Sequence, residues 1–512
     1  MGIPVREADH VIVGTGSAGS PLIRRLLDAG RTVLALEAGG RDDAAALRDP
    51  GQMVALRGTA VDHALQTVPQ PGLDGRSVPW PRGRVLGGSS AINGMVHIRG
   101  HRADYDAWAY GGADGWAYRD VLPYFRRLEN VDGDIDPLYR GTDGPLPARF
   151  ATDPHPVDAA QLEAAQQAGV PFNPDHNGAD IYGVGRAQLN IVDGRRVSAW
   201  DAYVRPVLSD PALVVLTDAL VTRVLVEAGR AVGVEYRHRG ETRIARSGGD
   251  VILAAGAVAS PQLLQLSGIG PADELRRLGV PVVVDLAGVG ANLHDHILAE
   301  VVWASRRPID PAAHPPLEVQ LFADSRPGLI GPDLQPVTGL AAYPLPGYEL
   351  PYGAVYAWFP GVVRPRSRGT LRLRDADPAS KPLLDPGYLR ERADLDALVA
   401  AIGLTREIGR QHALDDWNDG ELAPGPDVRT KAELEAYARL ALDTYYHPVG
   451  TTKIGVDAAS VVDPRLRVYG LEGLRVADAG VFPEVPAGNT HVPAVMVGER
   501  AADFILGTEP RA

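Results

Sequence analysis

Cysteine is absent from this sequence of 512 residues. The chain therefore forms no disulfide, uses no thiolate as a nucleophile, and binds no metal or iron–sulfur cluster through cysteine. For the same reason, cysteine content does not indicate the compartment in which the protein works.

Long apolar runs are also missing. No stretch approaches the ~18 consecutive apolar residues that a membrane-spanning helix requires. The first residues, MGIPVREADH, lack the apolar core of a signal peptide and lead directly into a short apolar run. We therefore expect no membrane association, a mature chain that starts at the first residue, and a cytoplasmic location.

The sequence has no excess of basic residues, since 51 Lys and Arg stand against 64 Asp and Glu, with a formal net charge of −13. This balance argues against nucleic acid and anionic membranes as partners, because both favour a basic surface. The length predicts two domains rather than one. Glycine (58) and proline (43) are spread along the chain, which predicts a compact protein rich in turns.

The N-terminal segment has the pattern of a dinucleotide-binding βαβ unit. An apolar run at 9–13 leads into Gly14, Gly16 and Gly19, a helical stretch, and a second apolar run that ends at Glu37. The first glycine permits a tight turn, the second allows a pyrophosphate to approach, and the third allows helix and strand to pack closely. Glu37 is placed to accept hydrogen bonds from a ribose. The acid disfavours NADP, whereas FAD and NAD both fit.

A second glycine-rich segment lies at 81–96. Gly87 and Gly88 precede two serines and an apolar run, so backbone N–H groups and hydroxyls are again offered to an anion, with Arg84 nearby as a charge. Glycine–serine pairs are more often helix N-caps than ligand clamps. This segment alone therefore does not decide between the two roles.

Six motifs in this order resemble the glucose-methanol-choline (GMC) oxidoreductases, a family of FAD-dependent enzymes. They are Gly14-x-Gly-x-x-Gly with Glu37, the stretch 83–94, the stretch 256–271, Arg364-Pro-Arg-Ser-Arg-Gly, Tyr446-His-Pro-Val-Gly-Thr, and Gly488-Asn-Thr-His. Together they span nearly the whole chain. The resemblance implies FAD rather than NAD.

The resemblance also implies which residues contact FAD. They are Gly14, Gly16, Ser17, Ala18, Gly19, Glu37, Ala38, Arg84, Gly87, Gly88, Ser89, Asn93, Gly94, Val96, Val221, Ala255, Gly256, Asp478, Ala479, Asn489, Thr490 and His491. Some family members attach FAD covalently through a histidine at the position of Ile92. Because isoleucine has no nucleophile, we expect FAD to be bound non-covalently.

The fold implied is mixed α/β, with a discontinuous Rossmann-like FAD-binding domain. We expect this domain to take residues 1–150, 186–295 and 440–512, and a substrate-binding domain to take 151–185 and 296–439. The β-rich runs at 212–216, 221–226 and 250–255 agree with the first assignment. Helical spacing at 391–411 and 430–442, with a strand at 371–373, predicts an antiparallel sheet backed by helices in the second.

Two histidines near the C-terminus, His447 and His491, fall on the family's catalytic positions. Histidine accepts protons well near neutral pH, so two imidazoles brought together would deprotonate a substrate hydroxyl. We assign His447 as the principal base. Family members carry His or Asn at the position of His491, which predicts that His491 hydrogen-bonds the substrate oxygen instead.

Two other groups of residues receive structural roles. His294 and His296 have a spacing that suggests a metal, but two histidines without further ligands are a weak signal and the stretch resembles a turn common in the family, so we expect no metal. An aromatic cluster lies in the predicted substrate domain, and core packing is its commoner role. Its members are Tyr352, Tyr356, Trp358 and Phe359.

The expected activity is FAD-dependent oxidation of an alcohol to the carbonyl. Proton abstraction would accompany hydride transfer to the flavin, which O2 or another acceptor reoxidises, and an oxidase is slightly favoured. The substrate is a small alcohol; primary aryl, furanic, aliphatic and amino alcohols all fit, and the aromatic residues mildly favour the aryl and furanic ones. A hydroxynitrile-lyase-like enzyme, a dehydrogenase with a quinone or protein acceptor, and an FAD carrier remain alternatives.

Overall fold

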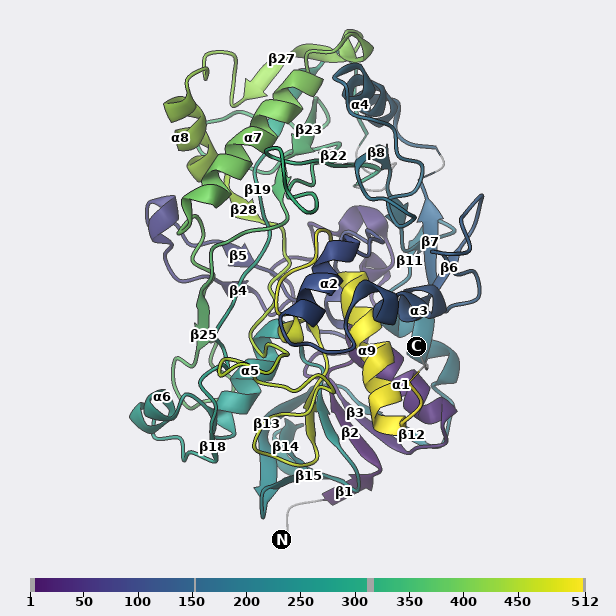
Figure 1. The fold of residues 1–512 in the computed structure, drawn as a ribbon, viewed down its shortest axis with the longest axis vertical. Helices are drawn as coiled ribbons and strands as arrows, with labels where there is room; N and C mark the ends of the chain where they lie inside the picture. The colour runs from purple at the N-terminus through teal and green to yellow at the C-terminus, as the bar shows by residue number, and fades with distance from the viewer. Residues whose placement is uncertain (1–4, 152, 311–316, 510–512) are drawn as a thin grey trace.

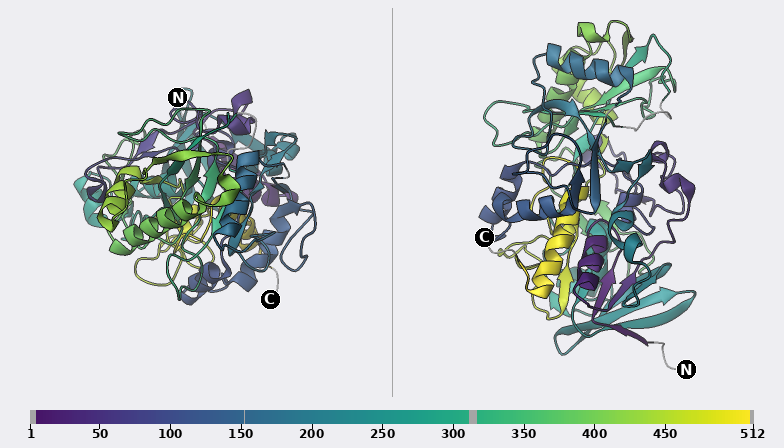
Figure 2. Two further views of the ribbon diagram at one scale, coloured as in Figure 1. Left: turned by 90° about the horizontal axis from the view of Figure 1, so that it is seen from above. Right: turned by 90° about the vertical axis from the view of Figure 1, so that its right-hand side faces the viewer.

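The computed structural model describes residues 5–151, 153–310 and 317–509. Figure 1 shows two halves stacked along the long axis, and the side view in Figure 2 shows the same division. A parallel sheet with helices α1 and α9 occupies the lower half, and an antiparallel sheet with α4, α7 and α8 occupies the upper half.

The lower half is built on a five-stranded parallel sheet in the order β12-β3-β2-β16-β29. Its strands come from the N-terminus, the middle and the C-terminal segment of the chain: β2 (His10–Val13), β3 (Val33–Leu36), β12 (Leu213–Leu216), β16 (Val251–Leu253) and β29 (Leu474–Val476). Helix α1 (Gly19–Asp28) connects β2 to β3, which confirms the predicted βαβ unit. The carboxyl ends of β2, β3 and β16 therefore open at one edge, where nucleotides bind in such sheets.

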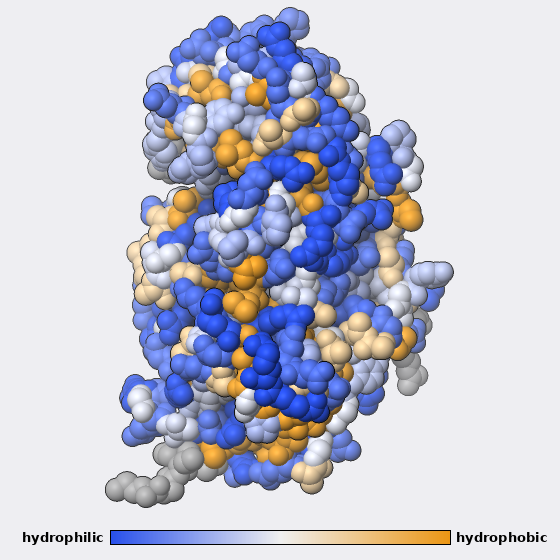
Figure 3. Space-filling model, turned by 90° about the vertical axis from the view of Figure 1, so that its left-hand side faces the viewer, coloured by the Kyte–Doolittle hydropathy of each residue, from blue (hydrophilic) through white to orange (hydrophobic). Residues whose placement is uncertain are grey.

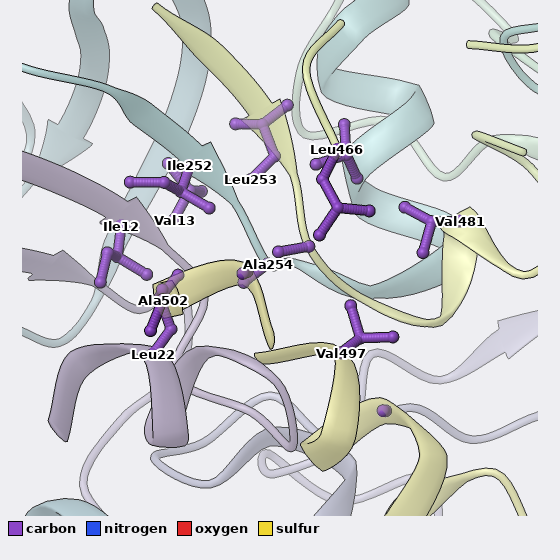
Figure 4. Packing of buried hydrophobic residues seen from close by; sticks show 14 of the residues in the cluster. Ile12, Val13, Leu22, Ile252, Leu253, Ala254, Leu466, Val481, Val497 and Ala502 are labelled. Carbon is purple, nitrogen blue, oxygen red and sulfur yellow. The ribbon is translucent and has the colours of Figure 1, made fainter. Parts of the chain in front are cut away.

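Helix α9 (His491–Leu506) packs beside α1 over this sheet. Almost every residue of α9 is buried, and its buried acids Glu499 and Asp503 are paired with Arg25 and Arg127. A Cβ on Gly498 would lie 2.1 Å from the carbonyl oxygen of Ala18, so glycine is required where the helix meets the Gly-rich turn. Figure 4 shows Ile12 and Ile252 from the sheet, Leu22 from α1 and Ala502 from α9 in one core.

A four-stranded sheet adjoins the parallel sheet. Its order is β1-β15-β14-β13, with the last three strands antiparallel. The strands are β1 (Val5–Ala8), β13 (Ala219–Glu227), β14 (Arg230–His238) and β15 (Glu241–Ser247). The strand predicted at 221–226 is therefore part of a longer meander.

The upper half contains a six-stranded sheet in the order β27-β20-β23-β22-β21-β8. All its described pairings are antiparallel, as predicted. The strands are β8 (Gly183–Arg186), β20 (Val301–Ser305), β21 (Val319–Phe322), β22 (Val337–Gly339), β23 (Val355–Phe359) and β27 (Asn418–Ala423). The associated helices are α4 (Pro156–Gln167), α7 (Arg392–Ile408) and α8 (Lys431–Ala441).

The two halves have separate apolar cores. Leu65, Leu73, Val78 and Trp80 contribute to the upper core, although the predicted boundaries assign them to the FAD-binding domain. The predicted domain boundaries at residues 150, 186, 295 and 440 therefore stay a prediction.

A short three-stranded sheet between the halves has the order β24-β19-β28. Strand β19 (Ile297–Leu298) pairs with β24 (Gly361–Val362) and with β28 (Asp443–Thr444). Because β19 follows His296 and β28 precedes His447, this pairing brings two histidines from distant parts of the sequence together.

The remaining helices and strands lie at the edges of these layers. They are α2 (Arg102–Tyr110), α3 (Tyr118–Leu128), α5 (Gly256–Leu266), α6 (Ala272–Arg277), β4 (Leu65–Gln66), β5 (Pro79–Trp80), β6 (Glu129–Val131), β7 (Leu146–Phe150), β9 (Gln188–Leu189), β10 (Ile191–Val192), β11 (Arg195–Arg196), β17 (Ile269–Gly270), β18 (Val284–Asp285), β25 (Thr370–Arg372) and β26 (Leu383–Asp385). Among the described residues, no helix combines the length and apolar character needed to cross a membrane. On the face shown in Figure 3, hydrophilic residues predominate and apolar residues form separate patches.

Candidate active site

A cavity of about 620 Å³ runs from the Gly-rich turn of the lower half to the wall of the upper sheet. Its lining contains His447 and nearly all the residues predicted to contact FAD. Gly19 and Gly87 are the two predicted residues outside the lining. Gly19 instead packs on the turn, where a Cβ would lie 2.1 Å from the carbonyl oxygen of Gly14, and Gly87 has a positive φ of 92° before a short helical turn.

The turn between β2 and α1 leaves no room for a side chain at Gly14. Gly14 has a φ of +99°, and a Cβ there would lie 2.5 Å from the carbonyl oxygen of Ala254. On the cavity side, Gly16 faces Gly88, whose Cα is 3.7 Å from the position of a Gly16 Cβ. The backbone N–H groups at the start of α1 are thus open to the cavity, a geometry that suits a pyrophosphate.

Glu37 lies at the end of β3 with its carboxylate buried. One oxygen accepts hydrogen bonds from the Thr15 hydroxyl (2.8 Å) and peptide N–H (3.2 Å), and the other accepts one from the Gly39 N–H (2.9 Å). Burial raises the pKa of Glu37, and these hydrogen bonds partly oppose that effect. A carboxylate can accept about four hydrogen bonds, so a site remains for a ribose hydroxyl. The glycine turn and this acid together fit the ADP part of FAD.

His447 lies at the opposite end of the cavity. Its Nδ1 is 3.0 Å from Nδ1 of His296, and its Nε2 is 3.2 Å from Nδ2 of Asn489. Its peptide N–H donates to Asp295 over 2.7 Å. Two contacts thus hold the imidazole and a third holds the backbone that carries it.

A chain of amides determines which nitrogen of His447 is basic. Nε2 of the fully buried Gln335 donates to Oδ1 of Asn489 over 3.0 Å, so the Asn489 side-chain NH2 faces His447. Nε2 of His447 must then accept, and its proton resides on Nδ1 and is donated to His296. This arrangement leaves an unprotonated nitrogen beside a hydrogen-bond donor at the cavity wall.

Asp295 holds the backbone around His447. The buried carboxylate also accepts hydrogen bonds from the Tyr388 and Thr444 hydroxyls, each over 2.5 Å. Burial raises the pKa of Asp295 to about 6. Tyr446 has a φ of 66°, which is unusual for a bulky residue and is tolerated where surrounding contacts enforce it. His447 is therefore rigidly placed.

The protonation state of His447 follows from its environment. Burial lowers the pKa of His447 well below its ordinary value of 6.5, and His296 and Arg82 lower it further. A histidine with a lowered pKa is neutral at pH 7. His447 can therefore act as a proton acceptor there.

His447 and His491 both line the cavity but have different hydrogen-bond partners, and their joint action on a substrate stays a prediction. His491 is the first residue of α9, and its Nδ1 lies 2.8 Å from the Ser17 hydroxyl of the Gly-rich turn. The described residue that contacts Nε2 of His447 is Asn489, which precedes the helix. Asn489 and His491 therefore form different hydrogen bonds, although both line the cavity with His447. Burial lowers the pKa of His491 to about 3, and it too is neutral.

His294 and His296 have different roles, although the sequence presented them as one pair. His294 is structural, since its Nδ1 is 2.6 Å from the Asn292 carbonyl oxygen and its Nε2 accepts the Val485 N–H over 3.0 Å. No group of three or more His, Asp or Glu suited to a metal occurs in the part of the chain that the structure describes. His296 and Gln335 are the site residues that sequence reasoning missed, and only His296 lay within a recognisable motif.

The wall of the cavity near His447 is apolar and aromatic. Of the predicted aromatic cluster, Phe359 lines the cavity, Tyr356 and Trp358 are fully buried in the core, and Tyr352 is 75% exposed. The alternation along β23 explains this, because successive strand residues face opposite sides of the sheet. Further lining residues at this end are Leu298, Leu317, Val337, Tyr343, Tyr445 and Tyr446.

Comparison with known proteins places this geometry in context. The family described as GMC oxidoreductase matches residues 8–298 with its N-terminal part and 365–498 with its C-terminal part. Choline dehydrogenase, mitochondrial, of Homo sapiens is 41% identical over 541 aligned residues, which cover 98% of this chain and 90% of the human protein. The oxygen-dependent choline dehydrogenase of Rhizobium etli is 38% identical, with 99% and 97% covered.

A solved structure is similar over nearly the whole chain. The crystal structure of pyridoxine 4-oxidase from Mesorbium loti superposes with a TM-score of 0.92 at 33% sequence identity, covering 96% of this chain and 98% of the oxidase. The similarity includes both halves of the molecule.

Proposed function

Because this chain belongs to the GMC oxidoreductase family, we propose that it oxidises a primary alcohol to the carbonyl at the His447–Asn489 end of the cavity. The protein is an FAD-dependent oxidoreductase that acts on CH–OH groups. One observation supports this location for the reaction above all. A neutral imidazole nitrogen and an amide donor, 3.2 Å apart, face the same cavity as the nucleotide-binding turn.

The two side chains have complementary tasks. The alcohol oxygen would bind between His447 Nε2, which accepts the hydroxyl proton, and Asn489 Nδ2, which donates to the oxygen as negative charge develops. FAD, when bound, supplies the acceptor for the hydrogen and two electrons that leave the alcohol carbon. After His447 accepts the proton on Nε2, its Nδ1–H still donates a hydrogen bond to His296. The orientation of the His447 imidazole is therefore unchanged during the transfer.

His296 and Gln335 act through their neighbours and are positioning residues. His296 accepts the Nδ1 proton of His447, which keeps Nε2 free. Gln335 orients the Asn489 amide, which keeps its NH2 group toward the substrate oxygen. Together they select one tautomer and one amide orientation for the resting site.

The other end of the cavity would hold the nucleotide part of FAD. Gly14, Gly16 and Ser17 would receive the pyrophosphate and Glu37 the ribose, as their geometry allows. His491, at the start of α9, faces this side through Ser17 and would contact the cofactor rather than the substrate. Ile92 lines the cavity without a nucleophile, so the attachment would be non-covalent.

We favour aryl or furanic alcohols as substrates because aromatic and aliphatic side chains form the wall near His447. Choline is the second candidate, since the two curated relatives bear its name. O2 or another electron acceptor completes the cycle.

Anaerobic mixing of the flavin-loaded enzyme with a panel of alcohols, followed by air, tests the proposal. An alcohol substrate bleaches the flavin, and air restores its colour if O2 is the acceptor. A lyase would convert its substrate without bleaching, and an FAD carrier would respond to no alcohol. Either result would exclude the proposed oxidation.

A further inference from the structure

Arg57 places a cationic group in the aromatic wall of the substrate end. Its guanidinium carbon lies 4.5 Å from the ring centre of Tyr446 and 4.9 Å from that of Tyr343, and all three residues line the cavity. Tyr446 directly precedes His447. The guanidinium and the proposed base therefore line the same cavity, and Arg57 contacts the residue that precedes the base in sequence.

The guanidinium has unused donors. Its Nη2 donates to the Tyr343 hydroxyl over 3.0 Å, and none of the carboxylates in the described ranges forms an ion pair with Arg57. Burial lowers the pKa of Arg57, but Tyr343, Tyr446 and Asp443 raise it more strongly, so the group is always charged. Asp443 does not line the cavity. Arginine presents five N–H donors, and most of these remain available.

The carboxylates that line the cavity are all engaged elsewhere. Glu37 accepts from Thr15 and Gly39 at the nucleotide end. Asp62 accepts the N–H groups of Gly58, Ala64 and Arg82. Asp478 accepts from Ser260, Gly256 and Gly480. These three carboxylates are therefore held by the protein itself, whereas Arg57 is a cation at the substrate end of the cavity.

Glu300 lies outside the cavity lining and adds little negative charge at the substrate end. It accepts the Tyr343 N–H over 3.0 Å. Burial raises its pKa to about 8. The carboxyl is therefore mostly neutral at pH 7 and offers little attraction to a cation.

We propose that Arg57 is a specificity-determining residue that binds a carboxylate carried by the ring of an aryl or furanic alcohol. A guanidinium pairs with a carboxylate through two parallel hydrogen bonds, and Tyr343 and Tyr446 hold it flat for that contact. The same charge disfavours a quaternary ammonium alcohol such as choline. This inference rests on the proposed alcohol oxidation and deepens it by defining the substrate class.

Three alcohols of similar shape and different charge test the inference. They are 4-(hydroxymethyl)benzoate, benzyl alcohol and 4-(hydroxymethyl)benzyltrimethylammonium. With the flavin-loaded enzyme, kcat/KM for the carboxylate is expected to exceed that for benzyl alcohol by about 10- to 100-fold, the range for a charge-assisted hydrogen bond. The ammonium compound is expected to be the poorest of the three.

Variants of Arg57 test whether this residue causes the preference for the carboxylate substrate. Arg57→Met is expected to raise KM for the carboxylate and abolish its advantage, so that the ratio of kcat/KM for the carboxylate to kcat/KM for benzyl alcohol falls to about one. Arg57→Lys should retain part of the preference because the charge remains while the paired hydrogen bonds are lost. Arg119→Met is the matched control, because its side chain is 87% exposed on α3 and outside the cavity lining.

The outcomes separate this inference from the proposed function. Equal kcat/KM values for the three alcohols, or a preference that survives Arg57→Met, would overturn the role of Arg57 while leaving alcohol oxidation intact. Faster turnover of choline or the ammonium compound would also overturn it. Absence of flavin bleaching with every alcohol would instead refute the proposed function. The wild-type comparison decides the charge preference even if a variant fails to fold.

Discussion

The two ends of the cavity are built by different means. At the nucleotide end, backbone N–H groups, glycines and one acid line the wall, and the βαβ part of it comes from one continuous stretch of sequence. At the catalytic end, side chains of His296, Gln335, His447 and Asn489 meet from four distant segments. Cofactor binding at the first end depends on the course of the backbone, whereas the reaction at the second end depends on the positions of individual side-chain atoms. Substitutions should therefore affect cofactor affinity at one end and reaction rate at the other.

The largest expected effect is at the catalytic end. His447→Ala removes the proposed base and should slow anaerobic flavin reduction by at least about a hundredfold, since a general base contributes ~10²- to 10⁴-fold. FAD should stay bound. His412→Ala is the control, because that side chain is 94% exposed. Stopped-flow absorbance measures both, and fast reduction in His447→Ala would contradict the assigned role.

The second prediction separates Asn489 from His491. Asn489→Ala loses the donor to the substrate oxygen and should lower the reduction rate by about 10- to 100-fold, the range for a hydrogen bond to a charged group. His491→Asn keeps hydrogen-bonding capacity near Ser17 and should retain most of the rate. Stopped-flow reduction of the two variants measures this difference. A slower His491→Asn enzyme would support the two-histidine pairing.

The third prediction concerns the nucleotide end. Glu37→Gln removes the charged acceptor for the ribose and should weaken FAD binding by about 1.5 to 3 kcal/mol, while the rate of the variant saturated with FAD changes little. Release of FAD on dilution, followed by flavin fluorescence, measures the affinity. Asp28→Asn, an exposed acid at the end of α1, is the control. Unchanged FAD retention in Glu37→Gln would show that Glu37 does not bind the ribose.

The fourth prediction uses pH. His296 lowers the pKa of His447, so His296→Gln should raise it. A base with a higher pKa becomes protonated at a higher pH, so the acid limb of kcat/KM should move to higher pH. The glutamine side chain still offers an oxygen that accepts the Nδ1 proton of His447. If His296 had a purely structural role, the substitution would lower the rate without moving the acid limb of the pH profile. An acid limb at the same pH in His296→Gln and the wild type would show that His296 is not a positioning residue for His447.

The smallest effect concerns the link between protein and cofactor. Because Ile92 cannot form a bond to FAD, acid precipitation should leave the yellow colour in the supernatant and a colourless pellet. Absorbance of the two fractions measures this. A yellow pellet would show covalent attachment and would place a nucleophile near the nucleotide end.

The comparison also explains which parts of the site were predictable. Glu37 and the glycines belong to one local pattern in which each residue has a backbone task, and the structure confirms the βαβ unit that contains them. His447 was found through its motif. Gln335 carried no sequence signal, because a buried amide is recognised only by the groups that surround it. Asn489 was assigned to the cofactor, since its position relative to the start of α9 decides which neighbour it meets.

The sequence by itself determined the family, the βαβ unit and the antiparallel sheet with its helices. The family follows from the order of the motifs, whereas the βαβ unit and the sheet follow from glycine placement and apolar periodicity, which act over short distances along the chain. Only the tertiary structure decided that Asn489 rather than His491 contacts His447, and that His296 lies behind it. Such contacts depend on the pairing of β19 with β28 and on the residue at which α9 begins, because these bring together residues that are far apart in the sequence.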